Sequence, residues 1–348
     1  MKAAIVESAG KLVVREVSVP EIGEYGCLCE LLYGATCSGT DLHIINDTFL
    51  WKIQYPTILG HESCGRVVKL GPKVRSFKMG DVITRVGTPP VDGIGVTWGG
   101  FAEYGIARDH VAMQEDGLPR EQWGGYRWNK VVPQDIGPDA ATMLTTWRET
   151  LSYLTRMGFA SGDSLLIVGS GGNGLSYLAH GVNLGGSRVG MIGSPDRAGM
   201  AHKLGATEYC SYKNDKLAED VKAAVPEGYK FIIDATGKNG ALDGAMQFLA
   251  ADGFATIYGV DDFGKCWINP SHARGSFTYL DRGYDEAETH EEVVEFVRQG
   301  KLDAGDWLNL DSPYPLERIN DAFDAVRERN VVKALVKLED SQQDVGEP

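Results

Sequence analysis

Hydrophobic and polar positions alternate in short segments along the first 110 residues or so of the chain. The opening MKAAIVESAGKLVVREV predicts a strand, a turn and a second strand, and GRVVKL predicts a further strand. Gly, Pro and Asp interrupt these segments at close intervals, as turn residues do. The pattern indicates a β-rich domain at the N-terminus.

From residue 139 onward, strands and helices alternate. The apolar runs SLLIV, RVGMIG, KFIIDATG and GFATIYGV predict buried strands, and the segments between them carry helical periodicity. This order is typical of a parallel sheet covered on both faces. After about residue 285, two amphipathic helices precede VVKALVKL, a strand that resembles the N-terminal β segments and predicts a return to the first domain.

The length of 348 residues favours two domains. We predict an α/β protein with a first domain at 1–150, completed by about 288–348, and a dinucleotide-binding domain at 151–287. Within the first domain lies a polar stretch at 110–137, whose length is typical of a lid or substrate loop. Its candidate substrate contacts are Trp123, Tyr126, Arg127 and Trp128, and Trp51 and Trp147 are candidate pocket walls.

A glycine turn, GSGGNG, follows the buried run SLLIV and opens a helix. In this context Gly169 makes the tight turn, Gly171 lets a pyrophosphate approach the backbone, and Gly174 lets helix and strand pack closely. The free N–H groups of the helix N-terminus then face the phosphates. The predicted contacts within this turn are Gly169, Gly171, Gly172, Asn173 and Gly174.

The end of the next strand predicts which dinucleotide binds. NAD-binding domains place an acid there for the ribose hydroxyls, but this chain has Ile192 and Gly193 at that point. Ser194 and Arg197 follow, and a guanidinium can pair with a 2′-phosphate. The sequence therefore favours NADP over NAD.

A second group of residues carries metal-binding chemistry. The segments CSGTDLH and GHESCG bring a thiol, an imidazole and a carboxylate, and Cys37, His61 and Glu62 form a plausible ligand set for one catalytic zinc. Asp41 could orient the ring of His61. Thr40 and His43 could pass a proton outward to solvent.

Composition excludes several classes of protein. The formal net charge is -14 and Lys/Arg-rich clusters are absent, so nucleic acid is not an expected partner. No apolar run reaches the length of a membrane-spanning helix or of a signal peptide, which favours a cytoplasmic protein without a membrane partner. The six scattered cysteines contain no Cys-x-x-Cys pair, and this excludes a four-cysteine structural zinc site.

The chain resembles the zinc-dependent medium-chain dehydrogenases that act on alcohols, polyols and sugars. The resemblance covers nearly the whole chain and rests on CSGTDLH, GHESCGRVVKLGPKVRSFKMGDVI, GGFAEY, GSGGNG, KLGA, DATG and the C-terminal segment PLERINDAFDAVRERNVVKALVKL. It implies a GroES-like domain that holds zinc and a Rossmann domain that holds the cofactor. It also implies a homodimer or homotetramer, joined through Rossmann strands for which GFATIYGV and CWINP are candidate edges.

The resemblance also implies residue roles. Cys37, His61 and Glu62 match zinc ligands, and Thr40 and His43 match the proton relay. The residues that match cofactor contacts are Lys333, at the phosphates, and Thr236, Val260 and Phe277, at the ribose and nicotinamide.

The chain departs from the family pattern in three places. CSGTD has one residue more than the usual spacing between the cysteine and the relay hydroxyl. The remaining zinc ligand is expected near Leu144 or Thr145, where threonine is a poor ligand and Glu149 lies one helical turn further on. The segment RVGTPPVDGIGVTWGGFAEY runs through the place of the structural zinc lobe.

These observations predict an enzyme that interconverts a secondary alcohol and a ketone on a sugar, a sugar alcohol or a cyclitol. Two alternatives stay open. One is a metal-free quinone or alkene reductase of the same superfamily, which does not need Cys37 with His61 and Glu62. The other is a non-catalytic dinucleotide-binding sensor, which does not need the relay.

Overall fold

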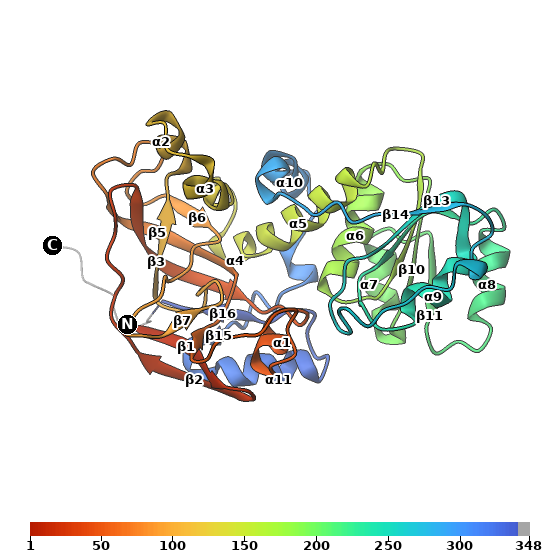
Figure 1. Ribbon diagram of the computed structural model, residues 1–348, viewed down its shortest axis with the longest axis horizontal. Helices are drawn as coiled ribbons and strands as arrows, with labels where there is room; N and C mark the ends of the chain where they lie inside the picture. The colour runs from red at the N-terminus through yellow and green to blue at the C-terminus, as the bar shows by residue number, and fades with distance from the viewer. Residues whose placement is uncertain (340–348) are drawn as a thin grey trace. The chain divides into compact units, whose positions relative to one another are not determined.

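The computed structural model describes residues 1–339, which form two compact units (Figure 1). The first unit contains residues 1–145 and 303–339, and the second contains residues 146–302. Helix α10 (His290–Arg298) belongs to the second unit, whereas the sequence assigned residues 288–302 to the first domain. The hydroxyl of Thr289 donates to the backbone oxygen of Arg148 at 2.9 Å and ties this helix to its own unit.

The first unit is built from β-strands that form two sheets. One sheet has the order β2-β1-β4-β7, and the other has the order β15-β16-β3-β5-β6 with β8 also paired to β3. The strands are β1 (Lys2–Ser8), β2 (Lys11–Glu16), β3 (Gly26–Ala35), β4 (Thr57–Ile58), β5 (Glu62–Leu70), β6 (Val82–Thr84), β7 (Gly95–Val96), β8 (Tyr104–Arg108), β15 (Tyr314–Pro315) and β16 (Leu335–Lys337).

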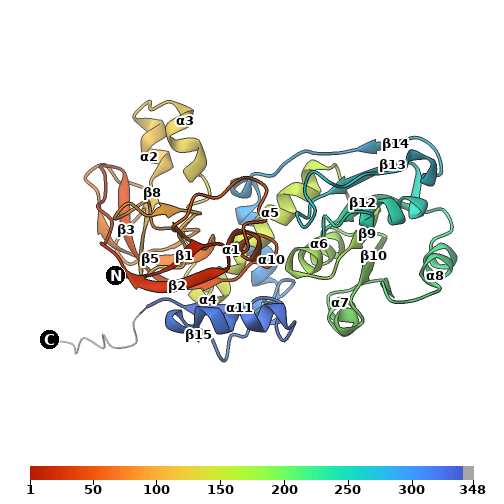
Figure 2. The ribbon, with the colours of Figure 1, turned by 60° about the horizontal axis from the view of Figure 1, so that its bottom comes forward.

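The C-terminal part of the chain completes this unit. Strand β16 pairs antiparallel with β3, and helix α11 (Ile319–Arg327) lies below the hairpin β1–β2 in Figure 2. The buried residues Ile319 and Phe323 on α11 join the same core as Ile5 of β1. Burial of such side chains stabilises the fold by roughly 1.5–3 kcal/mol each, so residues 303–339 are integral to the first unit.

Short helices connect the strands of the first unit. They are α1 (Asp41–Ile45), α2 (His110–Glu115), α3 (Arg120–Trp123), η1 (Gly124–Tyr126), α4 (Pro138–Ala141), η6 (Ala304–Asp306) and η7 (Leu316–Arg318). Helix α5 (Met143–Arg156) begins in the first unit and continues into the second.

The segment at 110–137 is not a plain loop, because α2, α3 and η1 lie within it. Asp109 begins this structure as the N-cap of α2, and its carboxylate accepts from the backbone N–H of Ala112 at 2.9 Å. Such a cap contributes about 1 kcal/mol to helix stability. The polar composition of this segment concealed the helices, since most of their residues are at least partly exposed.

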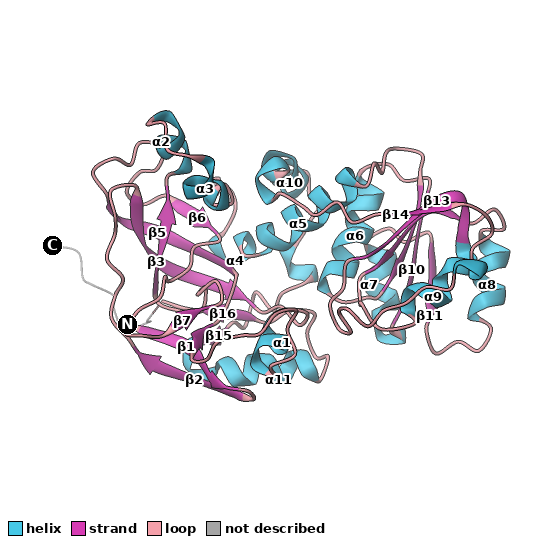
Figure 3. Ribbon diagram, viewed as in Figure 1, coloured by secondary structure: helices cyan, strands magenta, loops and turns pink. Residues whose placement is uncertain are grey.

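The second unit is a parallel sheet with helices packed against its strands (Figure 3). The strands are β9 (Ser164–Val168), β10 (Arg188–Gly193), β11 (Glu208–Ser211), β12 (Tyr229–Asp234), β13 (Leu249–Ile257) and β14 (Phe277–Tyr279). The helices are α6 (Gly172–Asn183), η2 (Pro195–Arg197), α7 (Ala198–Lys203), α8 (Leu217–Ala224), α9 (Ala241–Ala245), η3 (Met246–Phe248), η4 (Pro270–His272), η5 (Glu286–Glu288) and α10.

The order of the strands explains where a ligand can bind in the second unit. The sheet runs β11-β10-β9-β12-β13-β14, so the chain reverses direction across the sheet between β9 and β12. In open sheets of this kind the ligand lies at the carboxyl ends of the strands beside that reversal. The predicted glycine turn follows β9 directly and therefore lies at this point.

The prediction of GFATIYGV as edge material was wrong. Strand β13, which contains GFATI, pairs with β12 on one side and with β14 on the other. CWINP lies outside the strands of this part of the chain. The two outer strands are β11 and β14, and Tyr279 on β14 is 47% exposed.

None of the helices within residues 1–339 is both long enough and apolar enough to span a bilayer.

Candidate metal and cofactor sites

A closed turn holds Cys37 between β3 and α1. The backbone N–H of Cys37 donates to Asp41 Oδ2 at 2.8 Å, and the N–H of Asp41 donates back to the carbonyl oxygen of Cys37 at 2.9 Å. Asp41 is fully buried and Cys37 is 6% exposed. The thiol therefore occupies a fixed position away from bulk solvent.

Gly60 explains how His61 and Glu62 can reach the same point. Its φ of +102° is a conformation that side chains rarely allow, and a Cβ at this position would lie 2.6 Å from the ring of Phe101. The backbone bends here, and β5 begins two residues later at Glu62. The bend lets the adjacent His61 and Glu62 direct their side chains to one site, which a continuous strand would prevent.

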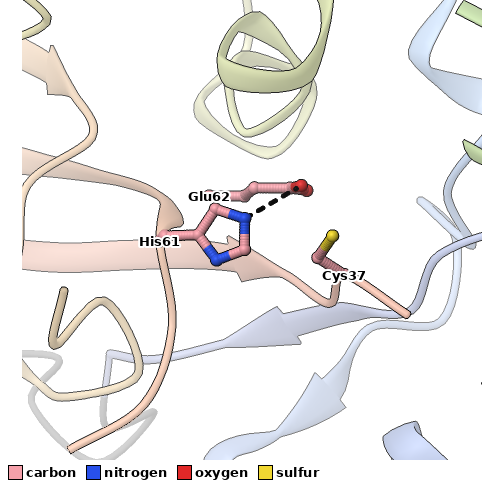
Figure 4. Close-up of side chains that lie close together, drawn as sticks. All are labelled: Cys37, His61 and Glu62. Carbon is pink, nitrogen blue, oxygen red and sulfur yellow. Dashed lines mark ion pairs between the residues drawn. The ribbon is translucent and has the colours of Figure 1, made fainter. Parts of the chain in front are cut away.

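The structure brings Cys37, His61 and Glu62 together (Figure 4). One candidate ligand atom from each lies within 4.8 Å of the other two, and all three residues are buried. No other group of three or more His, Cys, Asp or Glu residues with this spacing occurs among residues 1–339. Sulfur, nitrogen and oxygen donors at such distances fit zinc.

Asp41 lies beside the ring of His61, where an orienting carboxylate would lie. Asp41 Oδ1 lies 3.3 Å from His61 Nδ1, and neither atom has another hydrogen-bonding partner within the described chain. The other ring nitrogen, Nε2, lies 3.6 Å from Glu62 Oε1. With Nδ1 facing a carboxylate, Nε2 is the nitrogen available to a metal ion.

The electrostatics of this group favour positive charge. Burial lowers the pKa of His61, but the carboxylate of Asp41 and the nearby thiol of Cys37 raise it, and the net pKa is well above the ordinary value. A zinc ion supplies positive charge to the same donors, so the electrostatics also fit a cation.

Lys333 is a member of this group that sequence reasoning missed in this role. Its Nζ lies 2.6 Å from both carboxylate oxygens of Glu62 and 3.3 Å from the carbonyl oxygen of Thr36. Burial lowers the pKa of Lys333, but Glu62 and Cys37 raise it to a net value above the ordinary one. The 271 residues between Lys333 and Glu62 left no local signal of this pair. A phosphate contact by Lys333 stays a prediction.

The candidate relay residues lie at the start of α1. Thr40 is the N-cap residue of α1 and His43 lies three positions further, on the same side of the helix. The Nδ1 atom of His43 lies 2.7 Å from the hydroxyl of Thr48, and the N–H of Thr48 donates to the carbonyl oxygen of His43 at 2.9 Å. Thr48 was not predicted, although it is only five residues from His43.

Thr145 and Glu149, near the expected remaining ligand position, lie in different units. Thr145 is buried, and its hydroxyl has no hydrogen-bonding partner among the described residues. Glu149 belongs to the second unit, where it accepts from the hydroxyl of Tyr258 at 3.3 Å. The donor groups that lie together within the first unit are Cys37, His61 and Glu62.

The glycine turn has the backbone geometry that a dinucleotide needs. Gly169 has a φ of +110°, and a Cβ on it would lie 2.6 Å from Thr236. A Cβ on Gly174 would lie 2.0 Å from the carbonyl oxygen of Gly169, which explains the close packing of helix and strand. Gly171 has no atom within 4 Å of its Cβ position, so the space in front of it is open. Gly172 and Asn173 form the first turn of α6.

Ser194 and Arg197 follow β10 as expected. The N–H of Ser194 donates to the hydroxyl of Ser170 in the glycine turn at 2.9 Å. The hydroxyl of Ser194 lies 3.3 Å from Asp196 Oδ2, so one carboxylate does occur in this segment. Arg197 ends the short helix η2.

Thr236 and Val260 lie at the carboxyl ends of β12 and β13, but Phe277 does not share this position. Phe277 is the first residue of β14 and pairs with Gly253, four residues before the end of β13. Its side chain packs against the hydrophobic core of the second unit. A nicotinamide contact by Phe277 stays a prediction.

Matches to known proteins cover both units. The family model described as "Alcohol dehydrogenase GroES-like domain" matches residues 31–118, and the model described as "Zinc-binding dehydrogenase" matches residues 176–296. Together the two segments span more than half of the chain.

Relatives of similar length match almost end to end. The L-threonine 3-dehydrogenase of Vibrio parahaemolyticus is 26% identical over 328 residues, which cover 90% of this chain and 91% of that protein. The sorbitol dehydrogenase of Bacillus subtilis is 22% identical, and the match covers 93% of each chain. A zinc-binding dehydrogenase from Sinorhizobium meliloti, solved with NADP, superposes with a TM-score of 0.77 at 23% identity, and the match covers 97% of this chain and 98% of that one.

Proposed function

Because the chain belongs to the zinc-dependent medium-chain dehydrogenase family, we propose that it interconverts a secondary alcohol and a ketone on a polyhydroxylated substrate, with a nicotinamide dinucleotide as the hydride carrier. The buried group of Cys37, His61 and Glu62 carries this proposal. A sulfur, a nitrogen and an oxygen donor at one point suit a zinc-dependent reaction, and a metal-free reductase does not need them.

In this proposal Cys37, His61 and Glu62 hold one zinc ion. Bound zinc supplies a Lewis acid that polarises the substrate oxygen and lowers the pKa of the alcohol. Asp41 keeps Nδ1 of His61 engaged, so the ring presents Nε2 to the site. Lys333 balances the charge of Glu62 in the buried group.

The proton path uses Thr40 and His43. The hydroxyl of Thr40 takes the proton of the substrate hydroxyl, and His43 passes it on. Thr48 holds Nδ1 of His43 through its hydroxyl, which fixes the ring beside Thr40 in the proposed path. A bound nicotinamide supplies the acceptor for the hydride. The open backbone at Gly171 and the first turn of α6 bind its pyrophosphate.

NADP is the proposed cofactor, with NAD as the alternative. The absence of an acid at Ile192 and Gly193 and the presence of Arg197 support NADP. Asp196, which lies near the hydroxyl of Ser194, supports NAD. The ratio of kcat/KM for the two cofactors decides between them. Arg197→Ala should weaken NADP alone.

The proposed substrate class is a sugar, a sugar alcohol or a cyclitol. The match to a sorbitol dehydrogenase supports it. The match to L-threonine 3-dehydrogenases favours a second candidate, the oxidation of a hydroxy amino acid. A screen of polyols, sugars, simple alcohols and L-threonine with both cofactors tests the two. If simple primary alcohols outperform every polyol, the proposed class is wrong.

Metal content per chain is the first test. We expect about one zinc per chain on protein purified without added metal, and Cys37→Ala should lose both the zinc and the turnover. Cys210→Ser on β11 is the matched control and should keep both. A Cys37→Ala variant with near wild-type turnover would exclude the zinc role. A metal-free protein that still binds dinucleotide would favour the reductase or the sensor.

We also propose a homodimer or homotetramer and a cytoplasmic location. The exposed outer strand β14 is the surface on which a second copy could extend the sheet. Sedimentation of the wild type and of a variant with Pro at Thr278, in the middle of β14, tests the first proposal. Cell fractionation tests the second.

A further inference from the structure

Three aromatic rings gather beside His61 in the first unit. The ring centroids of Phe49 and Trp51 are 4.5 Å apart, and that of Trp98 is 6.3 Å from Phe49 and 6.2 Å from Trp51. The ring of Trp98 is also 5.3 Å from that of His61. Phe49, Trp51 and Trp98 are called the aromatic cluster below.

The aromatic cluster has an anchored side and an exposed side. Phe49 and Trp98 pack against the hydrophobic core of the first unit. Trp51 is 54% exposed, although it is one of the largest apolar side chains in the chain. A solvent-exposed indole next to a candidate reaction site can contact a bound ligand.

The backbone of Trp98 has an unusual conformation and closely packed surroundings. Its φ of +67° is uncommon for a residue with a bulky side chain. The backbone around it is tightly packed, because a Cβ on Gly87 would lie 1.8 Å from the carbonyl oxygen of Trp98. Residues in sparsely populated conformations cluster at ligand sites, where the surrounding structure fixes them. This closely packed backbone places the indole of Trp98 beside the ring of His61.

The loop that carries Phe49 and Trp51 is tied to the proposed relay. Thr48 precedes this loop and contacts His43 twice, through its backbone N–H at 2.9 Å and through its hydroxyl at 2.7 Å. A shift of the aromatic cluster would therefore also disturb His43. The metal group, the relay residue and the aromatic cluster form one connected structure within the first unit.

We propose that the aromatic cluster is a stacking surface for the flat face of a six-membered ring, so that the substrate is a pyranose sugar or a cyclitol and not an open-chain polyol. This inference rests on the proposed function and names the substrate class for it. Ring C–H groups form an apolar face that packs on the electron-rich face of an indole, while the ring hydroxyls point outward. An open-chain polyol lacks a flat face and loses more rotational freedom when it binds.

Matched ring and chain substrates test this inference. Myo-inositol and D-glucose provide rings, and D-sorbitol provides an open chain with the same kind of hydroxyl groups. We expect kcat/KM of the zinc-loaded wild type to be at least about tenfold higher for one of the ring compounds than for sorbitol. Trp51→Ala should lower kcat/KM for the ring compound about tenfold, mostly through a higher KM. The same variant should change kcat/KM for sorbitol less than about threefold. Trp51→Phe should recover most of the ring value.

Trp267→Ala is the control for the loss of an exposed indole. Trp267 is 56% exposed and lies in the second unit. This variant should leave both substrates unchanged. If Trp51→Ala lowers kcat/KM equally for the ring compound and for sorbitol, the stacking role is overturned. Oxidation of benzyl alcohol ahead of all ring polyols would overturn the substrate class.

Calorimetric titration separates this inference from the proposed function. We expect the ring compound to bind the zinc-loaded protein in the presence of oxidised cofactor, and Trp51→Ala to weaken that binding about tenfold. If no alcohol is oxidised but this binding difference remains, the proposed function fails and the stacking surface stands. If alcohols are oxidised and Trp51→Ala binds ring and chain as the wild type does, the inference fails and the proposed function stands.

Discussion

Two buried ion pairs, one in each unit, have almost the same burial but very different surroundings. In the first unit Lys333 pairs with Glu62 at 2.6 Å, and the two side chains are 3% and 1% exposed. In the second unit Arg148 pairs with Glu286 at 2.9 Å, and the side chains are 0% and 3% exposed. Burial and charge alone do not distinguish the two pairs.

The neighbours of each pair do distinguish them. Arg148 also lies 3.5 Å from His290 Nδ1, and its backbone oxygen accepts from Thr289, so this pair connects α5 to the start of α10. Glu62 instead lies beside the ring of His61 and near the thiol of Cys37, two groups that can bind a metal. A buried ion pair is therefore weak evidence of function until its surroundings are known.

Removal of Arg148 should have the largest effect. Arg148→Met leaves the carboxylate of Glu286 buried without its cation, and we expect the free energy of unfolding to fall by about 3–5 kcal/mol. Urea denaturation measures this loss. We expect the difference in unfolding free energy between wild type and Arg148→Met to be the same with and without zinc. A loss below about 1 kcal/mol would mean that the pair contributes little to this unit.

Removal of Lys333 should cause a loss of stability that depends on zinc, because Lys333 pairs with a candidate zinc ligand. Lys333→Met leaves Glu62 without its cation, and we expect a loss of about 2–3 kcal/mol in protein stripped of zinc. Saturating zinc should restore part of it, because zinc binds only the folded site and supplies the missing charge. The measurement is the zinc-dependent shift of the unfolding midpoint for the wild type, Lys333→Met and Arg148→Met. Equal zinc-dependent shifts in all three proteins would contradict the expected difference between the two ion pairs.

Asp109 extends the comparison to a buried carboxylate that is held by hydrogen-bond donors. It accepts from the N–H groups of Arg75, Ser76 and Ala112 at 2.7, 2.8 and 2.9 Å. Burial raises the pKa of Asp109, but these donors and the hydroxyl of Ser76 lower it to a net value below the ordinary 3.8. The charged form is therefore more stable in the folded state than in the unfolded state.

This predicts a specific pH dependence for Asp109→Asn. We expect a loss of about 1–2 kcal/mol at pH 7, because one charge-assisted acceptor is replaced by a neutral one. The contribution of Asp109 is fully present above its unfolded pKa near 4 and is lost as the pH falls through its lower folded pKa. The difference in unfolding free energy between wild type and variant should therefore shrink below pH 4. A difference that stays constant down to pH 3 would contradict the prediction.

An exposed ion pair should show the smallest effect. Arg156 contacts Glu288 at 2.9 and 2.6 Å, but the two side chains are 35% and 43% exposed. We expect Arg156→Met to cost less than about 1 kcal/mol, and less still at high salt, because water and ions screen the pair. Denaturation at two salt concentrations checks this. A loss equal to that of Arg148→Met would mean that burial is not the deciding factor.

The sequence was most informative where chemistry and backbone depend on neighbouring residues. The α/β fold class is confirmed, because SLLIV before GSGGNG specifies a strand, a turn and a helix within one short segment. The recognition of the dehydrogenase family is confirmed as well. Cys37, His61 and Glu62 do lie together, while their role as zinc ligands remains a proposal.

The sequence was less informative where partners are distant or where polar residues conceal helices. It treated 110–137 as a loop, because the exposed faces of α2 and α3 leave few apolar positions. It grouped Phe277 with Thr236 as cofactor contacts. The heights of residues on different strands can be compared only when the strand register is known, and Phe277 pairs with Gly253. It named GFATIYGV as an edge strand, although β13 lies inside the sheet. The order of strands depends on the complete sheet and cannot be obtained from one segment.

By itself, the sequence determined the local features of this protein: the glycine turn after β9 and the donor atoms that Cys37, His61 and Glu62 offer. The tertiary structure alone decided which charge balances Glu62 and which rings stand beside His61. The reason is physical. Backbone conformation and donor chemistry depend on a few adjacent residues, whereas the partner of a buried charge is chosen when the whole chain folds and brings Lys333 across 271 residues.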